Sequence, residues 1–127
     1  MKKSVLIIED NPLDAMLLER TMEINGYKGE ISTVSNINDA ILFTQDKINS
    51  KKKLPDLICL DMHFGDETGL VFLSFFNKLE SRIRKKVKII IITATKLLFE
   101  PEDLIINKRV SKVIDKPISF HQISAFL

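Results

Sequence analysis

The sequence predicts an α/β fold of the doubly wound type, with a five-stranded parallel sheet and helices on both faces. Short runs rich in valine, isoleucine and leucine alternate with helical stretches along the 127 residues. Three runs are nearly continuous in apolar residues, as expected of strands buried on both faces. The expected strands are Ser4–Ile8, Ile31–Val34, Leu57–Leu60, Val87–Ile92 and Val110–Ile114.

The first expected helix has a clear start and a clear end. Asn11 is a good capping residue, Pro12 suits the first helical position, and Asp14 favours the positive end of the helix dipole. Asn25-Gly26 ends the pattern. The helix carries an apolar stripe made of Leu13, Met16, Leu17 and Ile24.

Further helices are expected over about 38–49 and about 70–79, with a weaker one starting near Pro101 and a short one near Ser119. The basic runs at 51–53 and 82–88 are interpreted as solvated loops. The expected helix over about 70–79 carries three phenylalanines that fit one helix face: Phe72, Phe75 and Phe76. Either Phe75 or Phe76 is expected to be partly exposed.

Length and composition indicate a single globular domain over residues 1–127, with 45% hydrophobic and 28% charged residues. A net charge of +2 argues against a dedicated nucleic-acid binder. The lone Cys59 lies in an apolar run and is expected to be a buried thiol. No apolar run reaches the roughly 20 residues of a membrane span, so we expect a cytoplasmic protein.

Polar side chains follow four of the five expected strands. They are Glu9 and Asp10 after the first strand, Asp61 after the third, Thr93 after the fourth and Lys116 after the fifth. Ligands of open α/β sheets bind beyond the carboxyl ends of the strands. All five side chains are therefore expected at one edge of the sheet, whereas the second strand contributes nothing comparable.

Three neighbouring carboxylates predict a metal site. At about 4 Å and an effective dielectric near 20, each pair repels by roughly 4 kcal/mol, and a divalent cation removes that penalty. Oxygen ligands favour Mg²⁺, with Mn²⁺ as the other possibility. Thr93 as a hydrogen-bond donor and Lys116 as a point charge would hold an oxyanion. The set suits phosphoryl transfer onto a carboxylate.

The ordered motifs resemble those of response-regulator receiver domains in two-component systems, over essentially the whole chain. The family's loop also matches at Gly69, eight residues after Asp61. The resemblance implies a flavodoxin-like sheet order of 2-1-3-4-5 and a cis bond between Lys116 and Pro117. It is carried by Ile8-Glu9-Asp10-Asn11, Leu60-Asp61-Met62, Ile92-Thr93-Ala94 and Asp115-Lys116-Pro117.

The resemblance also implies a role for each site residue. Asp61 would be the phosphoacceptor, and Thr93 and Lys116 would bind the phosphoryl oxygens. The donor would be a histidine kinase or a histidine phosphotransfer protein. Such a domain is a switch in a phosphorelay and not an enzyme, with at most slow self-catalysed phosphorylation and dephosphorylation. The Mg²⁺ ligands would be Glu9, Asp10, Asp61 and the backbone carbonyl of His63.

Four positions depart from the family pattern or vary within it. Gly65 replaces the usual proline, and Val113 replaces the aromatic residue that swings inward on phosphorylation. His63 and Thr95 occupy positions that tune the phosphate lifetime. These residues bear on switching and lifetime more than on the phosphorylation chemistry.

Two other functions fit parts of the pattern. One is a docking module that kept the fold and works without phosphorylation, which the intact site residues disfavour. The other is a haloacid-dehalogenase-like phosphatase, which needs a second acid where this chain has His63. Intact mass after incubation with an acyl phosphate and Mg²⁺ separates the three.

Output is expected through protein contacts and not through DNA. Only ten residues follow Lys116-Pro117, so we expect a stand-alone receiver. The expected binding face combines the fourth helix, the fifth strand and the fifth helix, and its partner is an unknown downstream protein. Apolar and basic residues mix on this face: Leu97, Leu98, Phe99, Ile105, Lys108, Arg109, Lys112 and Phe120.

Overall fold

The computed structural model describes residues 3–64, 67–94 and 110–127. They form a five-stranded parallel sheet in the order β2-β1-β3-β6-β7. This confirms the expected order 2-1-3-4-5 of the main strands. The strands are β1 (Ser4–Ile8), β2 (Glu30–Val34), β3 (Leu57–Asp61), β6 (Lys88–Thr93) and β7 (Val110–Asp115).

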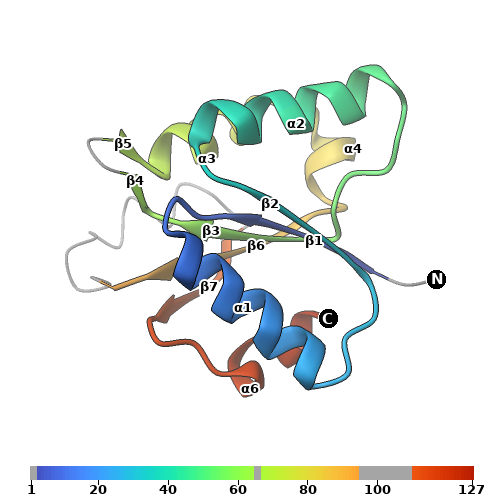
Figure 1. Ribbon diagram of the computed structural model, residues 1–127. Coiled ribbons are helices and arrows are strands. Elements are labelled where there is room, and N and C mark those ends of the chain that lie inside the picture. The colour runs from blue at the N-terminus through green and yellow to red at the C-terminus, as the bar shows by residue number, and fades with distance from the viewer. Residues whose placement is uncertain (1–2, 65–66, 95–109) are drawn as a thin grey trace.

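Helices cover both faces of this sheet (Figure 1). In that view, α2 (Ile37–Asn49) and α3 (Leu70–Asn77) lie above it. Below it lie α1 (Pro12–Ile24) and α6 (Phe120–Ile123), the latter followed by a 3₁₀ turn over Ser124–Phe126. We call these two sides the α2–α3 face and the α1–α6 face.

The alternation of strand side chains divides the core into two clusters, which we call the α2–α3 cluster and the α1–α6 cluster after the faces on which they lie. β1, β3 and β6 are buried almost throughout, as expected of central strands, and the edge strand β2 is half exposed. On the α2–α3 face the strands contribute Leu6, Ile8, Ile58, Leu60, Ile89 and Ile91. On the α1–α6 face they contribute Val5, Ile7, Leu57, Cys59, Ile90, Ile92 and Ile114.

Helix α1 begins where the sequence predicts, but its apolar stripe does not face the sheet. The Asn11 side chain accepts hydrogen bonds from the backbone N–H groups of Leu13 and Asp14. The buried residues of the helix are Ala15, Leu18 and Met22. The predicted stripe faces solvent instead, with exposed fractions of 65% (Leu13), 45% (Met16), 60% (Leu17) and 81% (Ile24).

Helix α3 does bury its predicted phenylalanines. Phe72 and Phe76 are fully buried and stack with ring centroids 6.2 Å apart. Phe75 is half-buried and packs against the same cluster. The expected exposure therefore falls on Phe75 and not on Phe76.

One local prediction is wrong, and one element was not predicted. The run at 82–88 is not one loop, because Ser81–Arg84 form the short helix α4, Val87 is buried, and Lys88 begins β6. A small antiparallel hairpin, β4 (His63–Phe64) with β5 (Glu67–Thr68), was not expected. Two residues per strand are too few for a recognisable alternation of polar and apolar side chains.

Several predictions fall outside the described residues. They are the fourth helix near Pro101, Gly65, Thr95, and most of the expected binding face. Within the part of the chain that is described, no helix combines the length and apolar character needed to cross a bilayer.

Candidate functional site

The register of the sheet brings the predicted site residues to one edge. Ile8 of β1 lies opposite Leu60 of β3, so Glu9 and Asp61, one residue further on, emerge side by side. Asp61 is in turn paired with Ile92, directly before Thr93. Strand polarity and register therefore gather residues from the carboxyl ends of β1, β3 and β6, as the sequence predicts.

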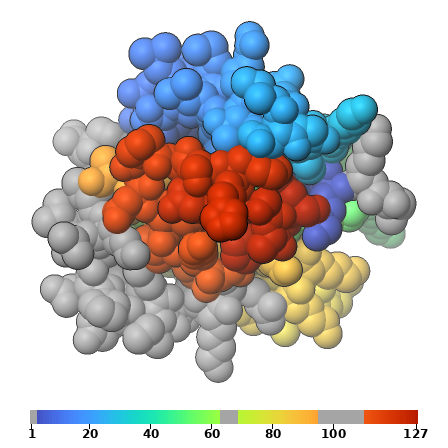
Figure 2. Space-filling view, turned by 90° about the horizontal axis from the view of Figure 1, so that it is seen from below, coloured from blue at the N-terminus to red at the C-terminus, as the bar shows by residue number. Residues whose placement is uncertain are grey.

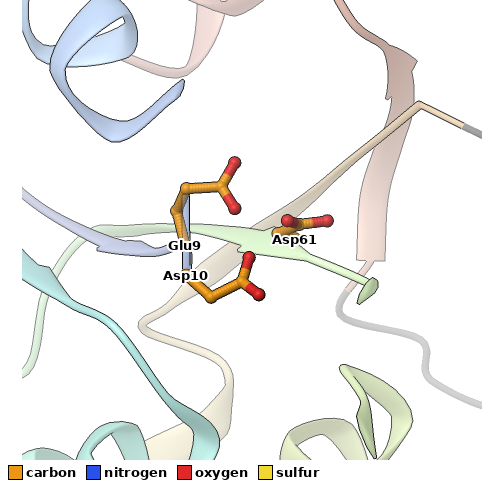
Figure 3. Close-up of side chains that lie close together, drawn as sticks. All are labelled: Glu9, Asp10 and Asp61. Carbon is orange, nitrogen blue, oxygen red and sulfur yellow. The ribbon is translucent and has the colours of Figure 1, made fainter. Parts of the chain in front are cut away.

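Three carboxylates form an acidic cluster at this edge (Figure 3). Oxygen atoms of Glu9, Asp10 and Asp61 all lie within 4.8 Å of one another. Glu9 and Asp61 are each 6% exposed, whereas Asp10 faces solvent. Buried carboxylates at such spacing repel unless a cation or a proton intervenes. The all-oxygen donor set fits a hard divalent cation.

The electrostatic consequence is visible at Glu9. Burial raises the pKa of its carboxyl to about 8, and the neighbouring Asp61 carboxylate adds to the rise. The Lys116 ammonium opposes this effect. The Glu9 carboxyl also accepts a hydrogen bond from the backbone N–H of Asn11, 3.4 Å away. The loop that carries the acids is therefore continuous with the cap of α1.

Lys116 lies among carboxylates, as the predicted site requires. Its Nζ atom is 2.5 Å from Glu9 Oε1, 2.8 Å from Asp14 Oδ2 and 3.4 Å from Asp61 Oδ2. Burial of the ammonium lowers its pKa, but the hydrogen bonds to Asp14 and Glu9 and the charge of Asp61 outweigh this, so the pKa is raised. The lysine is therefore charged at neutral pH.

The backbone holds Lys116 beside β6. Its N–H donates to the carbonyl of Thr93, with the two atoms 2.9 Å apart. The following bond to Pro117 is cis, as the resemblance implies. Thr93 itself is the last residue of β6 and is completely buried. Ala94, the residue after Thr93, is exposed.

Gly69 is required by close packing against the Asp61 strand. Its N–H donates to the carbonyl of Met62 at 2.9 Å. A Cβ atom at this position would lie only 2.8 Å from the carbonyl oxygen of Asp61 and 2.8 Å from Met62 Sδ. Any larger residue would push against the backbone that carries Asp61, which explains the glycine at the start of α3.

Asp14 is a site residue that the sequence analysis missed. It was assigned only a favourable position near the helix N-terminus, yet its carboxylate contacts Lys116. The available signal was its spacing, since it lies four residues after Asp10 in the first turn of a capped helix. That turn begins at the same sheet edge, which brings the Asp14 side chain to Lys116 after β7.

A cavity of about 210 Å³ adjoins the cluster on the α1–α6 face. Figure 2 views the molecule from this side, where α1 (blue) lies beside the C-terminal segment (red). Leu17 and Thr21 of α1 line the cavity, as do Cys59 of β3 and Ile118. Glu9, Asp14 and Asp61 line it as well, so the cavity lies directly beside the acidic site and α1.

The remaining predicted residues are placed in part. Val113 pairs with Ile91 and packs, half-buried, against the α2–α3 cluster. His63 belongs to the hairpin strand β4 directly after Asp61 and Met62, and its carbonyl as a metal ligand stays a prediction. Of the expected binding face, Lys112 is exposed and Phe120 packs, half-buried, against the α1–α6 cluster.

Comparisons with known proteins agree with this architecture. The chain matches the family model of the response regulator receiver domain over residues 5–127. It is 26% identical over 121 residues to the "Probable methanogenesis regulatory protein FilR2" of Methanothrix harundinacea, covering 94% of this chain and 75% of that protein.

Two solved structures share the fold. A two-component response regulator from Cytophaga hutchinsonii superposes with a TM-score of 0.84 at 19% identity, covering 99% of this chain and 95% of the other. The Mn²⁺-bound form of response regulator Rcp1 superposes with a TM-score of 0.71 at 18% identity, covering 95% and 86%.

The fold, the acidic pocket and the family match define a receiver domain, and the chain belongs to the response regulator receiver family. A receiver domain is a signalling phosphoacceptor of two-component systems and not an enzyme in its own right. Membership implies a histidine kinase as the source of the phosphoryl group. The pocket formed by Glu9, Asp10 and Asp61 is typical of a phosphoacceptor site that binds a divalent metal.

Proposed function

We propose that this chain, as one receiver domain over residues 1–127, is a switch that accepts a phosphoryl group on Asp61. The donor is a phosphorylated histidine of a kinase or of a phosphotransfer protein. The observation that carries the proposal is the convergence of three carboxylates and the Lys116 ammonium at one sheet edge.

Each residue has a chemical task in this transfer. A carboxylate oxygen of Asp61 attacks phosphorus, and the bond between phosphorus and the donor nitrogen breaks as the acyl phosphate forms. The leaving imidazole keeps the electron pair of that bond. Lys116 donates hydrogen bonds to the phosphoryl oxygens, and the Thr93 hydroxyl is proposed to donate another. These donors act in a largely buried site, where charge stabilisation is strong.

The proposed metal is Mg²⁺, with Mn²⁺ as an alternative. Its ligands would be Glu9, Asp10, Asp61 and the His63 carbonyl. When bound, the cation would neutralise negative charge on the acids and on the phosphoryl oxygens. The fit rests on the all-oxygen cluster, and the Mn²⁺-bound neighbour of the same fold supports the same class of ion.

The proposed output is a change in what binds the surface of the domain, in a cytoplasmic phosphorelay. A second protein would bind the face formed around β7, where Lys112 is exposed. The donor protein would approach the site past the exposed leucines of α1, Leu13 and Leu17. The half-buried Val113 does not have the reach of an aromatic side chain, so switching would involve the segment after Thr93.

The test is covalent labelling with a small phosphodonor. Incubation with acetyl phosphate and Mg²⁺ should raise the intact mass by one phosphoryl group. Asp61→Asn should abolish labelling, because an amide does not form the acyl phosphate, and chelation of Mg²⁺ should suppress it. Asp46→Asn, an exposed position on α2, is the matched control and should label normally.

Two results would contradict the proposal. Labelling of Asp61→Asn at the original rate would place the acceptor elsewhere. A complete lack of labelling in the original protein, despite added Mg²⁺, would instead favour the docking module that works without phosphorylation.

A further inference from the structure

Lys116 has three hydrogen-bond donors and three carboxylate neighbours. An ammonium group carries three N–H bonds. Its contacts with Glu9 and Asp14, at 2.5 and 2.8 Å, are both shorter than the 3.4 Å contact with Asp61. The ammonium therefore lies closer to Glu9 and Asp14, from the β1–α1 segment, than to Asp61, the proposed acceptor.

Asp14 is the unusual member of this set. Unlike Glu9, it does not belong to the acidic cluster that fits a cation. Its carboxylate is 36% exposed, whereas the Lys116 side chain is 19% exposed. It is fixed in the first turn of α1 by the Asn11 cap, which accepts a hydrogen bond from the Asp14 N–H. The contact is thus built into the start of the helix.

This arrangement creates a competition. A phosphoryl group on Asp61 needs hydrogen bonds from the Lys116 ammonium, and charge-assisted bonds of this kind are strong. One of the three donors points at Asp14. The phosphoryl oxygens must either displace Asp14 or share the lysine with it.

We propose that Asp14 is a positioning residue that holds the Lys116 ammonium toward α1 and thereby slows phosphorylation of Asp61. The proposal rests on the proposed function, because it concerns the same reaction. Asp14 acts through its contact with Lys116. Release of Asp14 from Lys116 would also link phosphorylation of Asp61 to the first turn of α1, where Asp14 lies between the exposed Leu13 and Leu17.

The variants separate this role from a general effect of charge. Asp14→Ala removes the competing acceptor, and Asp14→Glu keeps a carboxylate in the same turn. Glu23→Ala is the matched control, because it removes the same charge from an exposed position in the last turn of α1. Long-range charge effects are screened over roughly 8 Å at physiological salt, so the control should have little influence on the site.

The experiment measures two rate constants with acetyl phosphate and Mg²⁺. Asp14→Ala should accelerate phosphorylation of Asp61 roughly threefold to tenfold, as expected for one freed charge-assisted donor. Hydrolysis of the acyl phosphate should change by less than about twofold, because Lys116 then contacts the phosphoryl group in both the ground state and the transition state. A loss of structure would not accelerate one step and spare the other.

A second readout does not depend on phosphorylation. The rate at which an acylating reagent modifies Lys116, followed by peptide mass spectrometry, should rise in Asp14→Ala and stay low in Asp14→Glu. Faster phosphorylation and faster lysine modification, with Glu23→Ala resembling the original protein, would support the proposal.

Other outcomes overturn it. If the original protein is labelled and Asp14→Ala is within twofold of it or slower, Asp14 does not restrain the lysine, and the proposed function still stands. Equal acceleration by Glu23→Ala would show an effect of net charge only. If the original protein is not labelled at all, the proposed function fails and this inference fails with it.

Discussion

Helices α1 and α3 both begin at the edge of the sheet where the site lies, but they use their apolar side chains in opposite ways. α3 follows the Asp61 strand and the β4–β5 hairpin, and it buries Phe72, Leu73 and Phe76 in the α2–α3 cluster. α1 follows Glu9 and Asp10 and leaves four large apolar side chains in solvent. Among the described residues, only Leu42 and Val71 outside α1 are large, apolar and similarly exposed.

The two helices differ in what they do for the site: α3 anchors it in the core, and α1 borders the cavity beside it. On the α3 side, aromatic packing and the close contact of Gly69 with the Asp61 carbonyl fix the strand that carries Asp61, the proposed acceptor. On the α1 side, the site is held by polar contacts, the Asn11 cap and the Asp14–Lys116 ion pair, and a cavity opens beside it. One face thus packs the strand of Asp61 into the core, and the other leaves apolar side chains exposed beside the site.

The largest effect is expected on the α3 face. Phe72→Ala should lower the free energy of unfolding by about 3–5 kcal/mol, because it removes a fully buried ring and leaves a cavity. Val71→Ala, its exposed neighbour, should change it by about 0.5 kcal/mol or less. Urea denaturation of both variants measures the contrast. Similar losses for the two would show that α3 does not anchor the sheet in this way.

Within α1, two adjacent leucines test whether the exposed stripe contributes to folding. Leu18→Ala should cost about 2–5 kcal/mol, because Leu18 is 5% exposed and packs in the α1–α6 cluster. Leu17→Ala should be within about 0.5 kcal/mol of the original protein. The same denaturation experiment compares them. A large loss for Leu17→Ala would mean that the stripe packs against the body of the protein.

The smallest effect concerns Cys59, which lies beneath α1 and lines the cavity. Burial raises the pKa of its thiol from 9.0 to about 12. Above pH 9 the unfolded chain loses this proton while the folded chain keeps it, so stability should fall as the pH rises. The contribution is at most about 1.4 kcal/mol per pH unit.

Denaturation between pH 8 and about pH 11, with Cys59→Ala as the comparison, isolates this slope from those of the lysines and tyrosine. The variant should lose less stability over the range than the original protein. Equal slopes for the variant and the original protein would indicate that water reaches the Cys59 thiol through the cavity. The α1–α6 face would then be less tightly packed than the α2–α3 face.

Much of the fold was readable from the sequence because strong local patterns agree with the final packing. The apolar runs became strands within one or two residues, and the capping residues Asn11 and Pro12 marked the start of α1 correctly. The short hairpin after Asp61 and the helix at Ser81–Arg84 had no comparable signal. Their few residues gain order from neighbouring elements and not from their own periodicity.

The sequence by itself determined which chemical groups meet, because residues that follow parallel strands must share one edge of a sheet. The order of strands and polar residues along the chain therefore predicts that Glu9, Asp10, Asp61 and Lys116 meet, and they do. Only the tertiary structure decided which side of α1 faces the core, since both sides carry apolar residues and the rotation of a helix depends on what it packs against. The contact of Asp14 with Lys116 was likewise decided there, because 102 residues separate them and only the folded sheet brings the first turn of α1 beside the end of β7.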